Sequence, residues 1–209
     1  MGGDIKRNSQ FKAGDAIVLY SMLRKHRPKR IIEIGSGFSS AAMLDVNDLF
    51  LDHSIKFTFI EPNPQRLMGL LNQTDRTNIK IIESLAQRVS LDLFAELQEN
   101  DILFIDSSHV AKLGSDVNHI IFNILPQLNS GVLVHFHDIR YPFEYPRSTI
   151  EMGIAWNEAY FLRAFLMFNE QFRIHFFNSY MAEYHKDLMQ LIMPKFLDWP
   201  GGSIWMQRV

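Results

Sequence analysis

Short apolar segments alternate with longer amphipathic stretches along the 209-residue chain. The short segments have the length of buried strands, and the longer ones show the spacing of helices that pack on a sheet. Strands are expected at residues 30–34, 55–60, 79–82, 102–105, 132–136, 172–177 and 203–209. Helices are expected at residues 14–26, 39–51, 64–72, 86–98, 114–125 and 156–169, with a partly helical stretch at 181–197. This alternation predicts an α/β fold with a doubly wound, seven-stranded, mostly parallel sheet whose last strand is antiparallel.

The composition is that of an ordinary globular protein, with 47% apolar and 21% charged residues. We expect residues 1–209 to form a single domain, in which residues 1–29 are an N-terminal helical lead-in. The chain has no cysteine, so disulfides, thiolate zinc sites and a cysteine nucleophile are excluded.

The net charge of −2 does not indicate a polyanionic partner. Residues 1–30 carry 8 Lys and Arg against 2 Asp and Glu, so this segment could contact phosphates or simply be a solvated helix and loop. Nucleic acid is an unlikely partner, because the chain also lacks an Asn-Pro-Pro-Tyr motif. No apolar run reaches 18 residues, so we expect no membrane partner and a cytoplasmic location.

A glycine turn follows the first expected strand, in the segment Glu33-Ile34-Gly35-Ser36-Gly37. Glycines let the backbone approach a ligand closely, and the following helix presents free N–H groups. Ser40 replaces the third glycine of the dinucleotide motif, which argues against NAD and FAD. A carboxylate at Glu33 favours a ligand with a cationic ammonium or sulfonium, since it would repel a pyrophosphate.

Glu61 ends the second expected strand, where a carboxylate can accept hydrogen bonds from both hydroxyls of a ribose. A helix cap or a solvated loop acid is the structural alternative for Glu61 alone.

The series Glu33 to Gly37, then Glu61, then Asp106 resembles the motifs of class I S-adenosylmethionine-dependent methyltransferases over residues 12–138. The resemblance implies a Rossmann-like fold and a donor site. Residues implied to bind the donor are Glu33, Gly35, Ser36, Gly37, Glu61, Ser84 and Asp106. Ser84, implied to border the adenine, could equally cap a helix.

Acids and histidines gather after the fourth and fifth expected strands. Asp106 and His109 follow the fourth, and His135, His137 and Asp138 lie in or after the fifth. Neighbouring parallel strands would place Asp106, His109, His137 and Asp138 on one rim, and alternation puts His135 and His137 on one face. His135 could be a satisfied core histidine.

This group of residues is similar to the metal-assisted small-molecule O-methyltransferases, above all the branch that methylates macrolide sugars. The resemblance implies His109, Asp106 and Asp138 as catalytic residues, with His109 as general base. It also implies Asp106, His137 and Asp138 as ligands of a divalent cation, Mg²⁺ or Mn²⁺. His137 departs from the acid that is usual there, and a mixed His and Asp set suits Mn²⁺, iron or zinc better than Mg²⁺.

Residues 138–158 form an aromatic, proline-rich segment that we expect to be a lid over the acceptor. The run from residue 135 to 169 resembles a little-characterised bacterial subgroup of the class I enzymes, which implies acceptor-site roles for Tyr141, Glu144 and Glu158. A structural loop is the alternative for each of them.

The sequence thus predicts a methyltransferase that acts on a small-molecule acceptor, with O-methylation favoured by His109. Three other functions stay open: a nicotinamide oxidoreductase, a metal-dependent oxygenase or hydrolase that uses the histidines and acids, and a module that binds a donor without turnover. A homodimer is also an open expectation.

Overall fold

The computed structural model of the chain describes residues 11–72, 75 and 78–209, so residues 1–10 of the expected lead-in lie outside it. Its centre is a seven-stranded sheet in the order β3-β2-β1-β4-β5-β7-β6. Every pairing from β3 to β5 is parallel, and β7 runs antiparallel to both β5 and β6. The predicted doubly wound sheet with an antiparallel last strand is confirmed.

The strands begin and end close to where the apolar segments do, because each segment is bounded by charged or turn-forming residues. Their bounds are β1 Arg30–Ile34, β2 Lys56–Ile60, β3 Ile79–Ile82, β4 Ile102–Ile105, β5 Leu133–His137, β6 Phe172–Phe177 and β7 Ser203–Arg208.

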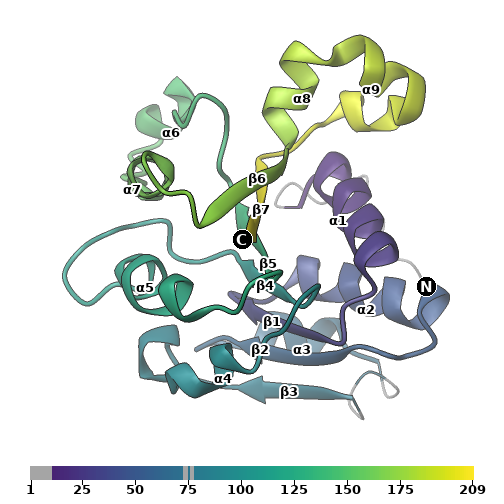
Figure 1. The fold of residues 1–209 in the computed structure, drawn as a ribbon, viewed down its shortest axis with the longest axis vertical. Coiled ribbons are helices and arrows are strands. Elements are labelled where there is room, and N and C mark those ends of the chain that lie inside the picture. The colour runs from purple at the N-terminus through teal and green to yellow at the C-terminus, as the bar shows by residue number, and fades with distance from the viewer. Residues whose placement is uncertain (1–10, 73–74, 76–77) are drawn as a thin grey trace.

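Helices cover both faces of the sheet (Figure 1). The α-helices are α1 Ala13–His26, α2 Phe38–Phe50, α3 Gln65–Leu70, α4 Leu91–Ala95, α5 Asp116–His119, α6 Arg147–Glu151, α7 Glu158–Leu166, α8 Asn178–Tyr184 and α9 Lys186–Ile192. In Figure 1, α1 and α2 lie to the right of the sheet, and α4 and α5 lie to its left. None of the helices in the described part of the chain has the length and apolarity to cross a bilayer.

Two expected helices differ from the prediction. Residues 86–98 form a short 3₁₀-helix, η3 Ala86–Arg88, and then α4, because Ser90 is extended and its hydroxyl accepts a hydrogen bond from Asp92 N. Residues 114–125 change from α5 to a wider π-helix, η4 Ile120–Ile124, and then to a 3₁₀-helix, η5 Leu125–Gln127, that contains Pro126. A proline ring clashes with the preceding helical turn and lacks an N–H, so a regular α-helix cannot continue through it.

The C-terminal third also differs from the prediction in detail. The expected helix at residues 156–169 begins only at Glu158, because the backbone N–H groups of Asn157 and Glu158 both donate to the carbonyl of His109. The partly helical stretch between β6 and β7 forms α8, α9 and a 3₁₀-helix, η6 Pro194–Asp198.

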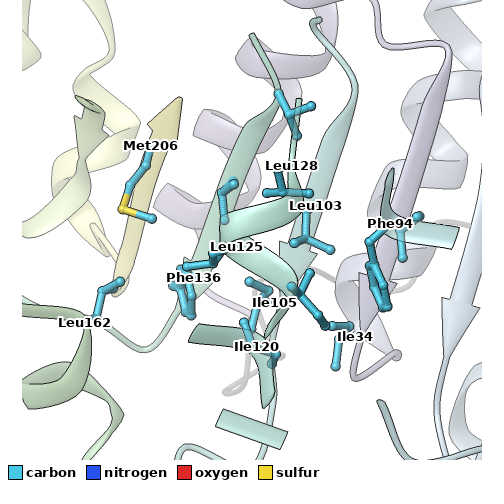
Figure 2. Packing of buried hydrophobic residues seen from close by; sticks show 14 of the residues in the cluster. Ile34, Phe94, Leu103, Ile105, Ile120, Leu125, Leu128, Phe136, Leu162 and Met206 are labelled. Carbon is cyan, nitrogen blue, oxygen red and sulfur yellow. The ribbon is translucent and has the colours of Figure 1, made fainter. Parts of the chain in front are cut away.

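Alternation along the strands divides the core into two layers. Ile34, Leu103, Ile105 and Phe136 point to the face covered by α4, α5, η4 and α7, as the close-up in Figure 2 shows for these residues. The alternate residues of the strands, such as Phe104, point to the opposite face, which α1 and α2 cover. Burial of both faces explains why the central strands are almost continuously apolar.

The parallel register brings the carboxyl ends of β1 and β4 together, with Ile34 paired to Ile105. The next residues, Gly35 and Asp106, therefore touch: a Cβ on Gly35 would overlap the Asp106 carbonyl oxygen. Gly35 also has a φ of +80°, which a side chain disfavours. Only glycine fits at this end of β1.

We predict that Gly35→Ala lowers the free energy of unfolding by at least about 2 kcal/mol, because the new methyl group meets backbone and the backbone conformation is strained. Chemical denaturation measures the change. Gly69→Ala is the matched control, since Gly69 lies in α3 and a methyl group added there would have no neighbour within 4 Å. That control should be neutral or slightly stabilising, and equal effects of the two changes would contradict the packing argument.

Candidate active site

Glu33 supports the glycine turn through hydrogen bonds with the first residues of α2. This side chain is fully buried, and it accepts hydrogen bonds from Ser39 Oγ at 2.5 Å and from Ser40 Oγ. Burial raises the pKa of Glu33 to about 8, although both serine hydroxyls favour the charged form. Glu33 therefore anchors the first turn of α2, and its direct contact with a donor stays a prediction.

Glu61 lies across the turn from Glu33 and fixes the other side of the loop. Its Oε2 accepts a hydrogen bond from Ser36 N at 3.2 Å, and its Oε1 accepts one from Asn63 N at 2.9 Å. The side chain is half-buried and lines a cavity. The sequence thus placed Glu61 correctly at the end of β2, beside the glycine turn.

The cavity that Glu61 lines has a volume of about 440 Å³, within the range of small-molecule sites. It opens at the carboxyl ends of β1, β2 and β4, where open α/β sheets bind ligands. Its lining residues are Ile34, Gly35, Ile60, Glu61, Pro62, Leu85, Ala86, Gln87, Asp106, Ser107, Ser108, Val110, Lys112, Gly114, Ser115 and Asp116. Gly35 and Asp106 both line the cavity, and their main chains lie directly against each other. Because Gly35 has no side chain, a ligand can approach the main chain there.

The wall after β3 differs from the sequence prediction. Ser84 does not line the cavity, and its hydroxyl donates to Leu85 O at 3.3 Å. The next residues, Leu85 to Gln87, line the wall instead. On the facing side, Asp116 accepts hydrogen bonds from Ser108 N at 2.9 Å and from Ser108 Oγ at 2.5 Å. The sequence analysis missed Asp116, whose only signal was its place in the first turn of an expected helix.

His109 is buried among three acidic side chains of the site. Its Nδ1 lies 2.8 Å from Glu158 Oε2, and its Nε2 lies 3.4 Å from Asp106 Oδ1 and 4.0 Å from Asp138 Oδ2. Only 6% of the residue is exposed, and the Trp156 ring lies 4.5 Å from its ring. The left-handed backbone at His109, with a φ of +59°, turns the ring toward these acids.

The acids determine the charge of His109. Burial disfavours the imidazolium, but hydrogen bonds and charges from Asp106 and Glu158 prevail and raise the pKa of His109 to about 10. For Asp106, burial also disfavours the charged form, yet His109, His137 and Arg66 together lower its pKa. The carboxyl groups around His109 thus favour its protonated form.

Glu158 has a different place from the one expected. It was predicted in the acceptor site, but only 1% of it is exposed, and both of its oxygens are used inside the protein. Ser107 Oγ donates to Oε1 at 3.1 Å, and Oε2 contacts the His109 ring. Glu158 therefore contacts the site through His109, and a role toward an acceptor stays a prediction.

Tyr141 and Glu144 contact other parts of the protein from within the lid segment. Tyr141 packs against Tyr180 and Tyr184 of α8, with ring centroids 5.2 and 5.4 Å away. Glu144 is exposed and accepts a hydrogen bond from Tyr160 at 2.9 Å. Their roles toward an acceptor stay predictions.

The histidines of β5 share one face of the strand, as the alternation predicted, and they lie on the side covered by α1. His135 is 1% exposed and stacks on Phe104 with a centroid distance of 3.7 Å, so it is a core histidine. Burial lowers its pKa well below the usual value. His137 is 3% exposed and lies against Phe11 at 5.5 Å.

The expected cation ligands were Asp106, His137 and Asp138. His137 Nε2 lies 4.0 Å from Asp138 Oδ1, while the His109 ring contacts both Asp106 and Asp138. Within residues 11–72, 75 and 78–209, no group of three or more His, Asp or Glu side chains is arranged to hold a metal ion. The three residues do not form an assembled metal centre here, and metal binding stays a prediction.

Solved structures share this fold at low sequence identity. The S-adenosylhomocysteine-bound methyltransferase PaMTH1 of Podospora anserina is 17% identical, with a TM-score of 0.57, over 93% of this chain and 77% of that one. The O-methyltransferase TomG of Streptomyces achromogenes, involved in tomaymycin synthesis and solved with S-adenosylmethionine, is 12% identical, with a TM-score of 0.60, over 95% and 81%. The protein cmcI, solved with Mg and S-adenosylmethionine, is 18% identical, with a TM-score of 0.56, over 95% and 72%.

One sequence relative is closer but shorter in overlap. An uncharacterised protein of Archaeoglobus fulgidus is 38% identical over 99 residues, which are 46% of this chain and 43% of that protein. The alignment thus spans less than half of the relative.

The family described as methyltransferase domain matches residues 32–139, just over half of the 209-residue chain. This segment runs from β1 to the residue after Asp138 and contains the glycine turn, Glu61 and Asp106. The resemblance on which the sequence analysis relied is confirmed, and the chain belongs to the methyltransferase domain family, with the fold of the class I S-adenosylmethionine-dependent enzymes.

Proposed function

We propose that this protein transfers the methyl group of S-adenosylmethionine to a hydroxyl of a small-molecule acceptor. The observation that carries the proposal is the position of Asp106. It lines the 440 Å³ cavity beside Gly35 and Glu61, and it also contacts His109. Asp106 thus links a pocket large enough for a nucleoside to a histidine that can accept and donate a proton.

In this proposal the adenosine of the donor occupies the cavity. Glu61 accepts hydrogen bonds from the ribose hydroxyls, and Leu85 to Gln87 border the adenine in place of Ser84. The backbone of Gly35 to Gly37 borders the methionine part, while Glu33 keeps this turn in place through Ser39 and Ser40. Asp106, whose pKa is low, remains charged beside the cationic sulfonium.

The reaction is a displacement at the methyl carbon. The acceptor oxygen forms a bond to that carbon as its bond to sulfur breaks, and the hydroxyl proton leaves to a base. The products are a methyl ether and S-adenosylhomocysteine. The protein accelerates the step mainly by holding the donor and the acceptor in line at close distance.

We assign His109 as the base, acting through Nε2, which faces Asp106 and Asp138. With a pKa of about 10, His109 carries a proton before the donor binds. A sulfonium beside Asp106 places a second positive charge nearby, which lowers the pKa of His109 and favours release of that proton to solvent, so that the neutral Nε2 can then take the proton of the acceptor hydroxyl. Glu158 holds Nδ1, so Nε2 is the nitrogen that exchanges protons.

The acceptor would enter on the side of Asp138 and the lid segment, residues 138–158. We propose that all of these parts belong to one domain, since α7 of the lid side and the β4–α5 loop are joined through Glu158 and His109.

O-methylation by TomG supports a hydroxyl acceptor, as does a histidine base. A divalent cation at Asp106 and Asp138 would bind and acidify the acceptor hydroxyl, which makes added Mg²⁺ and Mn²⁺ useful arms of any assay.

We predict that His109→Asn lowers turnover by at least about 100-fold while the dissociation constant of the donor changes less than about threefold. Asparagine tolerates the left-handed backbone at this position, so the loop should keep its shape. Release of S-adenosylhomocysteine is measured with small alcohols and phenols and with their amine counterparts, with Mg²⁺, Mn²⁺ or chelator. His185→Asn, at an exposed histidine, is the control.

Turnover of His109→Asn near the wild-type value would contradict the assignment of the base. A clear preference for amines over the matched hydroxyl compounds would contradict O-methylation but would leave methyl transfer intact.

We predict that Glu158→Gln lowers kcat about 10- to 100-fold with little change in the KM of the donor, because the orienting charge on His109 Nδ1 is lost. Glu158→Asp should recover part of the activity. Glu151→Gln, at an exposed acid of α6, is the matched control. If Glu158 were only structural, its loss would lower the stability and leave kcat per folded molecule unchanged.

A further inference from the structure

A second, smaller cavity lies at the glycine turn, where Ser36 and Gly37 line it, while Gly35 lines the larger cavity. Its volume is about 30 Å³, enough for one small polar group. Its lining residues are Phe11, Ser36, Gly37, Phe38, Ser39, Arg66 and Asp106. Asp106 lines both cavities, so the two adjoin at this residue.

The small cavity contains one cationic and one anionic side chain. Arg66 approaches from α3, and its charge is close enough to contribute to the low pKa of Asp106. The guanidinium also lies over the Phe38 ring at 6.0 Å. A guanidinium and a carboxylate that face the same cavity complement a zwitterion, such as the free amino-acid group of a ligand.

The backbone beside Arg66 is shaped for close approach to an anion. A Cβ on Gly37 would lie 3.2 Å from Arg66 Cδ, so glycine lets the arginine reach the turn. The first N–H groups of α2, from Phe38 onward, lack intrahelical partners and favour negative charge. The buried Ser36 Oγ has no hydrogen-bond partner among the described residues, which also indicates that a polar group from outside can bind here.

We infer that Arg66 binds the α-carboxylate of the methionine part of the donor, with Ser36 and the start of α2, while Asp106 receives its α-ammonium. This inference rests on the proposed function and adds a residue that neither the sequence motifs nor the family resemblance indicated. It makes Arg66 a determinant of donor specificity: the residue distinguishes a nucleoside that carries an amino acid from one that does not.

The test compares two nucleosides in calorimetric titrations. S-adenosylhomocysteine carries the amino-acid group, whereas 5′-methylthioadenosine has the same adenosine and thioether without it. We expect Arg66→Met to weaken S-adenosylhomocysteine about 10- to 100-fold, the usual loss for a charge-assisted hydrogen bond. The affinity for 5′-methylthioadenosine should change less than about twofold, which also shows that the variant is folded. Arg66→Lys should recover part of the loss.

Arg163→Met, at an exposed arginine of α7, is the matched control and should leave both affinities unchanged. Equal effects of Arg66→Met on the two nucleosides, or no effect on either, would overturn the inference while the proposed function stands. If wild-type protein binds neither nucleoside, the proposed function itself fails, and the assignment of Arg66 fails with it.

Discussion

The contact on which the rest of the site depends is the close approach of two strand ends, at Gly35 after β1 and Asp106 after β4. The parallel register places their main chains against each other, with no room for a side chain on Gly35. This approach puts the glycine turn, Glu61 and Asp106 around one cavity, and it leaves Asp106 exposed to both cavities. Stable strands thus hold the site, so that little of its geometry relies on loops alone.

A second constraint is the charge balance around His109. Three carboxylates, Asp106, Asp138 and Glu158, surround a single buried imidazole. The carbonyl of His109 also receives the first N–H groups of α7, so the same residue ties the lid side of the molecule to the β4 loop. Burial of a charged group is costly unless the group is paired. Glu158 is enclosed, and this cost explains why Ser107 donates a hydrogen bond to it.

The sequence predicted the parts that short-range patterns determine. The bounds of β1, β3, β4 and β6 match the apolar segments, and the ends of β1, β2 and β4 gave Gly35, Glu61 and Asp106 their places. The pattern could not reveal that Glu158 meets His109, because 49 residues separate them and α7 must first pack on η4. Arg66 was missed for a similar reason, since nothing in its local sequence shows that α3 directs it toward Gly37. His137 was expected on the rim; its buried ring packs against Phe11, and its Nε2 lies 4.0 Å from Asp138 Oδ1.

The most direct test of the account is calorimetric binding of S-adenosylmethionine to the purified protein, repeated with Mg²⁺, Mn²⁺ and chelator and with the Glu61→Ala variant. The account predicts saturable one-to-one binding that weakens about 10-fold or more in Glu61→Ala, because the ribose loses a charged acceptor. Glu170→Ala, at an exposed acid before β6, should bind as wild type does. Absence of binding to folded wild-type protein under every condition would contradict the account.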